Sequence, residues 1–243
     1  MESVSIAVGH GKMMRGALAS PRVEGERPAI IVIHEIFGLN NDIRAKAQRF
    51  ADAGYVALAP DVFSAFGRKP LCIFRAVQSL RAGDGPAFEY LERARQWLAE
   101  RPEVDGSRIG VIGFCMGGGF ALLFAAKSEV GAAAVFYGDV PKDPQLVETA
   151  CPVVAGFGGR DRVFGKNGAR LARHLQAAGV VNDVVTYPDA GHSYMSEHRG
   201  VVAKVNSWGP MRVGFNAAAA EDSWRRVDEF FGRYLGPEAA GGQ

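Results

Sequence analysis

Short apolar runs alternate with longer amphipathic stretches along most of this 243-residue chain. The runs 28–33 and 132–137 are almost uninterrupted in their apolar character, which is typical of strands buried on both faces of a parallel sheet. The predicted strands are 3–8, 13–19, 28–33, 55–59, the run that leads into Gly113, 132–137, 153–157 and 182–187. The first two flank a Gly-His-Gly turn and are expected to pair as an antiparallel hairpin at an edge.

Helical periodicity fills the intervals between these strands. The predicted helices are 42–53, 71–80, 87–100, 121–127, 171–178 and 224–235. Asn40 or Asn41 is suited to cap the first helix and Gly54 to end it. Strands that alternate with helices predict an α/β fold with one doubly wound, mostly parallel sheet, in a single domain over 1–243 with a flexible tail at 236–243.

The amphipathic stretch 71–80 allows two interpretations. Its arginines, Arg75 and the neighbouring Arg81, are most simply solvated side chains of a surface helix. The alternative is a cap over a pocket, in which the same arginines meet an acidic substrate.

Composition and charge argue against proteins that bind nucleic acid or membranes. The formal net charge of +2 is small and spread along the chain, so a nucleic-acid or anionic-membrane surface is not expected. No apolar run reaches membrane-spanning length, and no signal segment is visible. Three scattered cysteines fit a reducing compartment. We therefore expect a cytoplasmic enzyme for a small molecule, as a monomer or small homo-oligomer.

The segment 107–120 carries the strongest chemical signal. An apolar run leads into Gly113-Phe114-Cys115-Met116-Gly117, and a run of small residues follows. This pattern is typical of a nucleophile elbow with cysteine in the position that serine usually holds. Glycine two residues to either side allows strand and helix to pass closely. A buried structural cysteine or a glycine-rich phosphate loop is the alternative.

Partners for Cys115 follow in the expected order. Asp161 and His192 each come directly after a predicted strand, so the chain order is nucleophile, acid, histidine, as in the α/β-hydrolase elbow fold. A thiol reacts as thiolate, so it needs a base, and the base needs a carboxylate to fix its tautomer. The sequence leaves competing residues for both partner roles: Asp139 and Asp189 for the acid, His174 and His198 for the base.

These motifs together resemble the dienelactone hydrolase family of α/β hydrolases. The matching segments are 34–40 (HEIFGLN), 113–118 (GFCMGG), 159–161 (GRD) and 190–193 (AGHS). The resemblance implies a Cys-His-Asp triad formed by Cys115, His192 and Asp161. It also implies that Glu35 contacts the resting thiol and helps to deprotonate it, and that the backbone N–H groups of Ile36 and Met116 form the oxyanion hole.

The chain departs from the family pattern where substrate would bind. Family members active on dienelactone hold the substrate carboxylate with arginines, one of them four residues after the catalytic histidine. That position is Ser196 here. The remaining candidates for substrate binding are Arg75, Arg81, Arg199 and Trp208.

We therefore expect a hydrolase of small esters or lactones of the carboxymethylenebutenolide type, acting through an acyl-cysteine intermediate and requiring neither metal nor organic cofactor. The alternative is a broader carboxylesterase or thioesterase on neutral esters, which Ser196 motivates. A third hypothesis is a non-catalytic α/β-hydrolase fold that binds a ligand or senses redox state through Cys115.

Overall fold

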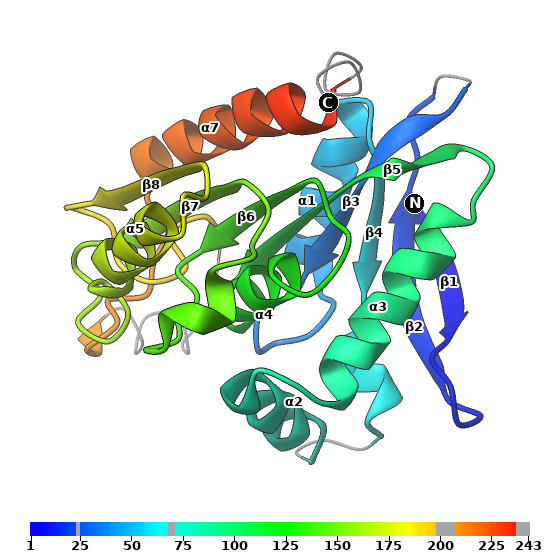
Figure 1. Cartoon of the computed structure of the whole chain (residues 1–243), viewed down its shortest axis with the longest axis horizontal. Helices are drawn as coiled ribbons and strands as arrows, with labels where there is room; N and C mark the ends of the chain where they lie inside the picture. The colour runs from blue at the N-terminus through cyan, green and yellow to red at the C-terminus, as the bar shows by residue number, and fades with distance from the viewer. Residues whose placement is uncertain (23–24, 68–70, 198–207, 237–243) are drawn as a thin grey trace.

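A single eight-stranded sheet forms the centre of the computed structural model, which describes residues 1–22, 25–67, 71–197 and 208–236 (Figure 1). The strand order is β1-β2-β4-β3-β5-β6-β7-β8. The strands are β1 (Glu2–Ala7), β2 (Met13–Ala19), β3 (Arg27–Ile33), β4 (Val56–Pro60), β5 (Val104–Phe114), β6 (Ala132–Phe136), β7 (Val153–Gly158) and β8 (Asn182–Tyr187).

The pairing confirms the predicted mostly parallel sheet. β1 and β2 form an antiparallel hairpin at one edge, and β2 also runs antiparallel to β4. All other neighbours, from β4 through β3 and β5 to β8, are parallel. The carboxyl ends of these parallel strands therefore meet at one edge of the sheet, where ligands bind in open α/β folds.

Helices cover both faces of the sheet. The α-helices are α1 (Asn41–Asp52), α2 (Leu71–Ala82), α3 (Pro86–Ala99), α4 (Met116–Ala125), α5 (Asn167–Ala177) and α7 (Ala217–Leu235), and the short 3₁₀ helices are η1 (Val62–Ala65) and η2 (Pro144–Val147). α2, α3, α4 and α5 contribute to one apolar core, and α1 and α7 to a second core on the opposite face (Figure 1). This confirms the doubly wound arrangement.

Several helix boundaries differ from the predicted ones. α4 begins at Met116 instead of 121, because its glycines let the first turn press against the sheet: a Cβ at Gly118 would lie 2.6 Å from the carbonyl oxygen of Phe136. α7 begins at Ala217 instead of 224, capped by the Asn216 side chain. Four successive alanines open α7, and they show no apolar periodicity from which the earlier start could be predicted.

The start of α1 follows the sequence signal. Asn40 is the capping residue, and its Oδ1 accepts the Ile43 N–H at 3.0 Å. Gly54 follows the helix with a φ of 95°, a conformation that glycine adopts without strain. These two residues fix how the chain turns back from the carboxyl end of β3 into α1.

Candidate active site

Cys115 lies on a strained turn between β5 and α4. Its φ of 54° and ψ of −119° are unusual for a residue with a side chain. A Cβ at Gly113 would lie 1.9 Å from the Gly117 carbonyl oxygen, and a Cβ at Gly117 would lie 2.4 Å from that of Ile33. The two glycines flanking the turn are therefore required by the close passage of strand and helix, as the sequence pattern predicts.

His192 and Asp161 meet at the carboxyl edge of the sheet. Asp161 follows β7 and His192 follows β8, and His192 Nδ1 lies 2.7 Å from Asp161 Oδ2. The other carboxylate oxygen, Oδ1, accepts the backbone N–H groups of Val163 and Phe164 at 2.8 and 3.0 Å. Both side chains are buried. The Asp161 carboxylate is thus held in one orientation while it contacts the imidazole.

The competing residues lie elsewhere. Asp139 Oδ1 accepts the Val140 N–H at 3.0 Å, and His174 Nε2 lies 3.3 Å from the Pro141 carbonyl oxygen. Asp189 is exposed, and His198 lies outside the described residues. Of the described candidates for the two roles, the structure therefore pairs the two that the chain order favours.

The Asp161 contact determines which nitrogen of His192 carries the proton. A carboxylate only accepts hydrogen bonds, so Nδ1 of the neutral ring is the donor and Nε2 is left as the basic nitrogen. Within the described part of the chain, Nε2 is buried and has no hydrogen-bond partner of good geometry. Burial lowers the pKa of His192, but the hydrogen bond to Asp161 and the neighbouring Cys115 raise it by more, so that the pKa is about 9.

Aromatic rings enclose the imidazole. The ring centroids of Tyr137 and Phe164 lie 5.2 and 5.1 Å from that of His192. Tyr137 directly follows β6 and has a φ of 41°, which is rare for a bulky residue. This strained conformation marks Tyr137 as part of the site, although its sequence position suggested only the end of a buried strand.

A buried polar network surrounds Glu35, which lies in the loop after β3. Ser196 Oγ donates to Glu35 Oε1 at 3.0 Å and accepts from Lys46 Nζ at 3.2 Å. The Tyr137 hydroxyl lies 3.3 Å from the same Oγ, and it must donate because the one Ser196 proton points to Glu35. Burial, then the charge of Glu35, raises the pKa of Tyr137 well above its ordinary value, which keeps this donor protonated.

Lys46 is the member of this network that sequence reasoning missed. It lies on α1, is buried, pairs with Asp42 one turn earlier, and places its Nζ 4.9 Å from the centre of the Phe114 ring. Aspartate and lysine four residues apart on a helix are the usual pattern of a solvated surface pair. Only the packing of α1 against the loop that carries Ser196 turns Lys46 inward.

The two residues expected to form the oxyanion hole follow neighbouring strands of the sheet, Ile36 after β3 and Met116 after β5. Met116 is the first residue of α4, so its backbone N–H has no partner within the helix. Ile36 lies in the loop directly after Glu35, with its side chain exposed.

The described candidates for substrate binding are exposed or line a separate cavity. Arg75 lines a separate cavity, whose described lining includes none of the triad residues. Arg81 is exposed in the last turn of α2, and the Trp208 side chain is 84% exposed. Arg199 lies outside the described residues.

The described ranges contain no group of three or more His, Cys, Asp or Glu side chains placed to hold a metal ion. None of the helices in these ranges is long and apolar enough to cross a membrane.

Comparisons with known proteins identify the family of this chain. The model of the dienelactone hydrolase family matches residues 14–235. A carboxymethylenebutenolidase from Rhodococcus opacus is 30% identical over 224 residues, which cover 87% of this chain and 83% of the relative. A crystal structure of a dienelactone hydrolase-like promiscuous phosphotriesterase from metagenomic libraries has a TM-score of 0.79 at 25% identity, covering 97% and 98% of the two chains. The dienelactone hydrolase of Anabaena variabilis has the same fold, with a TM-score of 0.68 at 21% identity over 96% and 97%.

Proposed function

Because the chain belongs to the dienelactone hydrolase family of hydrolases, we propose that it cleaves small esters or lactones of the carboxymethylenebutenolide type with Cys115 as nucleophile. The Asp161–His192 hydrogen bond carries this proposal. It leaves Nε2 as the basic nitrogen of a histidine whose pKa is raised partly by the Cys115 side chain.

In the first half of the reaction, His192 Nε2 takes the thiol proton and Cys115 Sγ attacks the carbonyl carbon of the substrate. The tetrahedral intermediate carries a negative oxygen, which the N–H groups of Ile36 and Met116 stabilise. When the intermediate collapses, the C–O bond breaks and His192 returns the proton to the leaving alkoxide. A thioester on Cys115 remains.

In the second half, His192 takes a proton from water, and the resulting hydroxide attacks the thioester carbonyl. The C–S bond breaks, the thiolate recovers a proton from His192, and a carboxylic acid is released. Asp161 holds the imidazole in its tautomer and stabilises the imidazolium that forms in each half.

Glu35 has a different role in this scheme. Glu35 contacts the resting thiol and helps its deprotonation when substrate binds, while His192 Nε2 is the group that takes the proton. Ser196 holds the Glu35 carboxylate in place by donating to its Oε1 at 3.0 Å, and Lys46 Nζ in turn donates to Ser196 Oγ at 3.2 Å.

Ser196 favours a second candidate function, the hydrolysis of neutral esters or thioesters. The side chain is fully buried, and its hydroxyl is occupied by Glu35, Lys46 and Tyr137. Ser196 therefore brings no charge to a substrate carboxylate at the position where relatives active on dienelactone have an arginine.

The two functions are separated by measuring the hydrolysis of dienelactone and of p-nitrophenyl acetate side by side, with wild type and Cys115→Ser. Dienelactone turnover that is lost in the variant supports the lactonase. Turnover of the aryl ester alone supports the neutral esterase. If Cys115→Ser retains wild-type rates on both substrates, the cysteine mechanism is wrong.

A further inference from the structure

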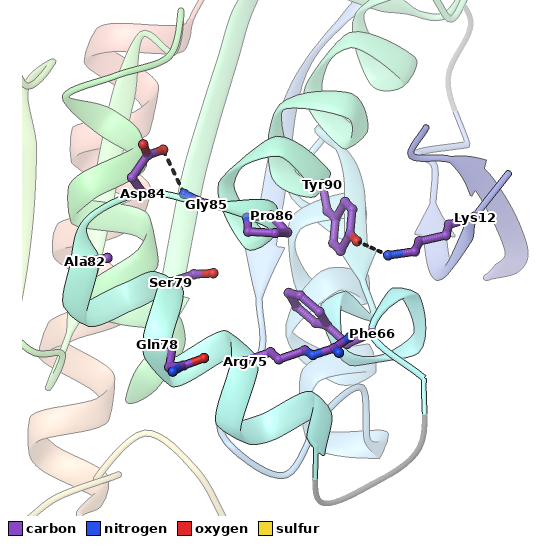
Figure 2. Close-up of a pocket in the computed structure, with 10 residues that line it drawn as sticks. All are labelled: Lys12, Phe66, Arg75, Gln78, Ser79, Ala82, Asp84, Gly85, Pro86 and Tyr90. Atoms are coloured by element: carbon purple, nitrogen blue, oxygen red, sulfur yellow. Dashed lines mark hydrogen bonds between the residues drawn. The ribbon is translucent and has the colours of Figure 1, made fainter. Parts of the chain in front are cut away.

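A cavity lies between α2, the start of α3 and the β1–β2 hairpin (Figure 2). Its volume is about 330 Å³, within the range of small-molecule sites. The residues that line it are Lys12, Phe66, Arg75, Gln78, Ser79, Ala82, Asp84, Gly85, Pro86 and Tyr90. None of them belongs to the triad or to the Glu35 network.

Two cations in this cavity have no anionic partner among the described residues. Lys12 Nζ donates to the Tyr90 hydroxyl at 3.0 Å, which leaves its charge unneutralised. Arg75 forms neither an ion pair nor a side-chain hydrogen bond with the described chain, and Figure 2 shows it extended beside the Phe66 ring. The cavity contains one carboxylate, Asp84, whose Oδ1 accepts the Gly85 N–H at 2.7 Å, at the other end of the cavity from Lys12.

Ser79 supplies an unused polar group in the same place. Only 5% of the residue is exposed, and its hydroxyl bonds to no described residue. Figure 2 shows the hydroxyl pointing from α2 into the cavity. Because the Oγ atom itself is accessible from the cavity, it can donate a hydrogen bond to a ligand there.

The remaining wall is largely apolar. The Phe66 and Tyr90 rings pack with centroids 5.1 Å apart, and Pro86 stands beside them at the start of α3. Rings and a proline offer flat surface to an apolar group, while the cations and the hydroxyl offer hydrogen bonds to an anionic one.

We propose that this cavity is a second binding site, separate from the catalytic centre, for a small organic carboxylate with a flat apolar body. The carboxylate pairs with Arg75 and Lys12 and accepts the Ser79 hydroxyl. The apolar body lies against Phe66 and Pro86. The site depends on no step of the proposed hydrolysis.

The test is a calorimetric titration of the full chain with benzoate, and with benzamide as its neutral counterpart. We expect saturable benzoate binding that is roughly tenfold tighter than benzamide binding. Arg75→Gln and Lys12→Gln should each weaken benzoate binding roughly tenfold. Arg93→Gln removes an exposed arginine of α3 outside the cavity and should leave it unchanged.

Two controls identify the site. Binding should persist after Cys115 is alkylated, and benzoate should not compete with p-nitrophenyl acetate for hydrolysis. The proposal is overturned if benzoate does not saturate, if benzamide binds equally well, or if the Arg75 and Lys12 variants bind like wild type. Loss of binding on alkylation of Cys115 would also overturn it, by assigning benzoate to the catalytic centre. A protein without esterase activity that still binds benzoate would refute the proposed function and leave this site standing.

Discussion

The pKa of His192 bears on both the proposed chemistry and the stability of the fold. Burial opposes a charged imidazole, while Asp161 and Cys115 favour it, and the second influence dominates. A pKa raised from 6.5 to about 9 means that the folded state binds the proton more tightly than the unfolded chain. The stabilisation is therefore complete below pH 6.5 and is lost as the pH rises through 9.

Asp161→Asn should lower the pKa of His192, because a neutral amide stabilises the imidazolium less than a carboxylate does. The pH titration of the imidazole C–H resonance by NMR measures it: the wild-type midpoint should be near 9, and that of the variant clearly lower. Asp189→Asn, at an exposed neighbouring position, should titrate like wild type. Equal midpoints for wild type and Asp161→Asn would show that the carboxylate does not determine the pKa.

Ser196→Ala should destabilise the fold, because Glu35 Oε1 and Lys46 Nζ then lose the buried hydroxyl that they share. We expect the free energy of unfolding in urea to fall by about 1–3 kcal/mol. Ser5→Ala, on an exposed position of β1, should change it by less than about 0.5 kcal/mol. A Ser196→Ala protein as stable as Ser5→Ala would contradict the network.

The sequence is informative about individual residues where the backbone alone brings them together. Cys115, Asp161 and His192 are predictable because each follows a parallel strand, and parallel strands share one carboxyl edge. Lys46 is not predictable, because its inward direction depends on how α1 packs against a loop 150 residues away in sequence. Tyr137 carries no polar pattern, and only its positive φ and its contact with His192 reveal it.

At the scale of elements, close backbone packing holds the β5–Cys115–α4 unit: a Cβ at Gly113 would lie 1.9 Å from the Gly117 carbonyl oxygen. Strands and helices of the sheet were predictable from apolar runs, and so were the two glycines that flank Cys115. The starts of α4 and α7 were not predictable, because glycine and alanine runs lack the periodicity that indicates a helix.

Gly113→Ala should strongly impair this unit, since its Cβ would overlap the backbone of Gly117. We expect a loss of at least about 3 kcal/mol in the free energy of unfolding or failure to accumulate as folded protein. Gly232→Ala is the matched control, because the added Cβ on α7 meets nothing within 4 Å. It should stabilise the chain by about 0.5–1 kcal/mol through helix propensity. A folded Gly113→Ala protein of wild-type stability would refute the close passage.

At the scale of the whole molecule, side-chain contacts of Arg226 and Asp222 join α7 to β8, the last strand of the sheet; we call them the α7–β8 clamp. Arg226 on α7 contacts Asp183 of β8 at 2.8 and 2.9 Å and Asp222 at 2.8 Å, and Tyr187 at the end of β8 donates to Asp222 at 2.9 Å. The hydrogen bonds from Arg226 and then Arg225 hold the pKa of Asp222 well below its ordinary value. His192 follows β8 directly, so this clamp also supports the site.

A carboxylate with a lowered pKa stabilises the fold above its unfolded pKa and ceases to do so as the pH falls toward its folded pKa. Wild type should therefore lose more stability between pH 7 and pH 3 than Asp222→Asn does. Because the side chains are partly exposed, we expect a difference of about 0.5–1 kcal/mol in urea unfolding. Glu229→Gln, at a more exposed partner of Arg225, should follow wild type. If the free energy of unfolding falls equally between pH 7 and pH 3 in wild type and Asp222→Asn, the stabilising role of the Asp222 contacts is wrong.

In the proposed reaction, the acyl group of the substrate is carried by Cys115. We would rapidly quench wild type during turnover of p-nitrophenyl acetate, digest it and analyse its cysteine peptides by mass spectrometry. The peptide that contains Cys115 should carry one acetyl group, and those of Cys72 and Cys151 should carry none. His192→Gln, tested in parallel, should acetylate Cys115 far more slowly. Sustained hydrolysis by wild type with an unmodified Cys115 peptide would contradict the acyl-cysteine mechanism. A wild-type rate of hydrolysis in Cys115→Ala would contradict it as well.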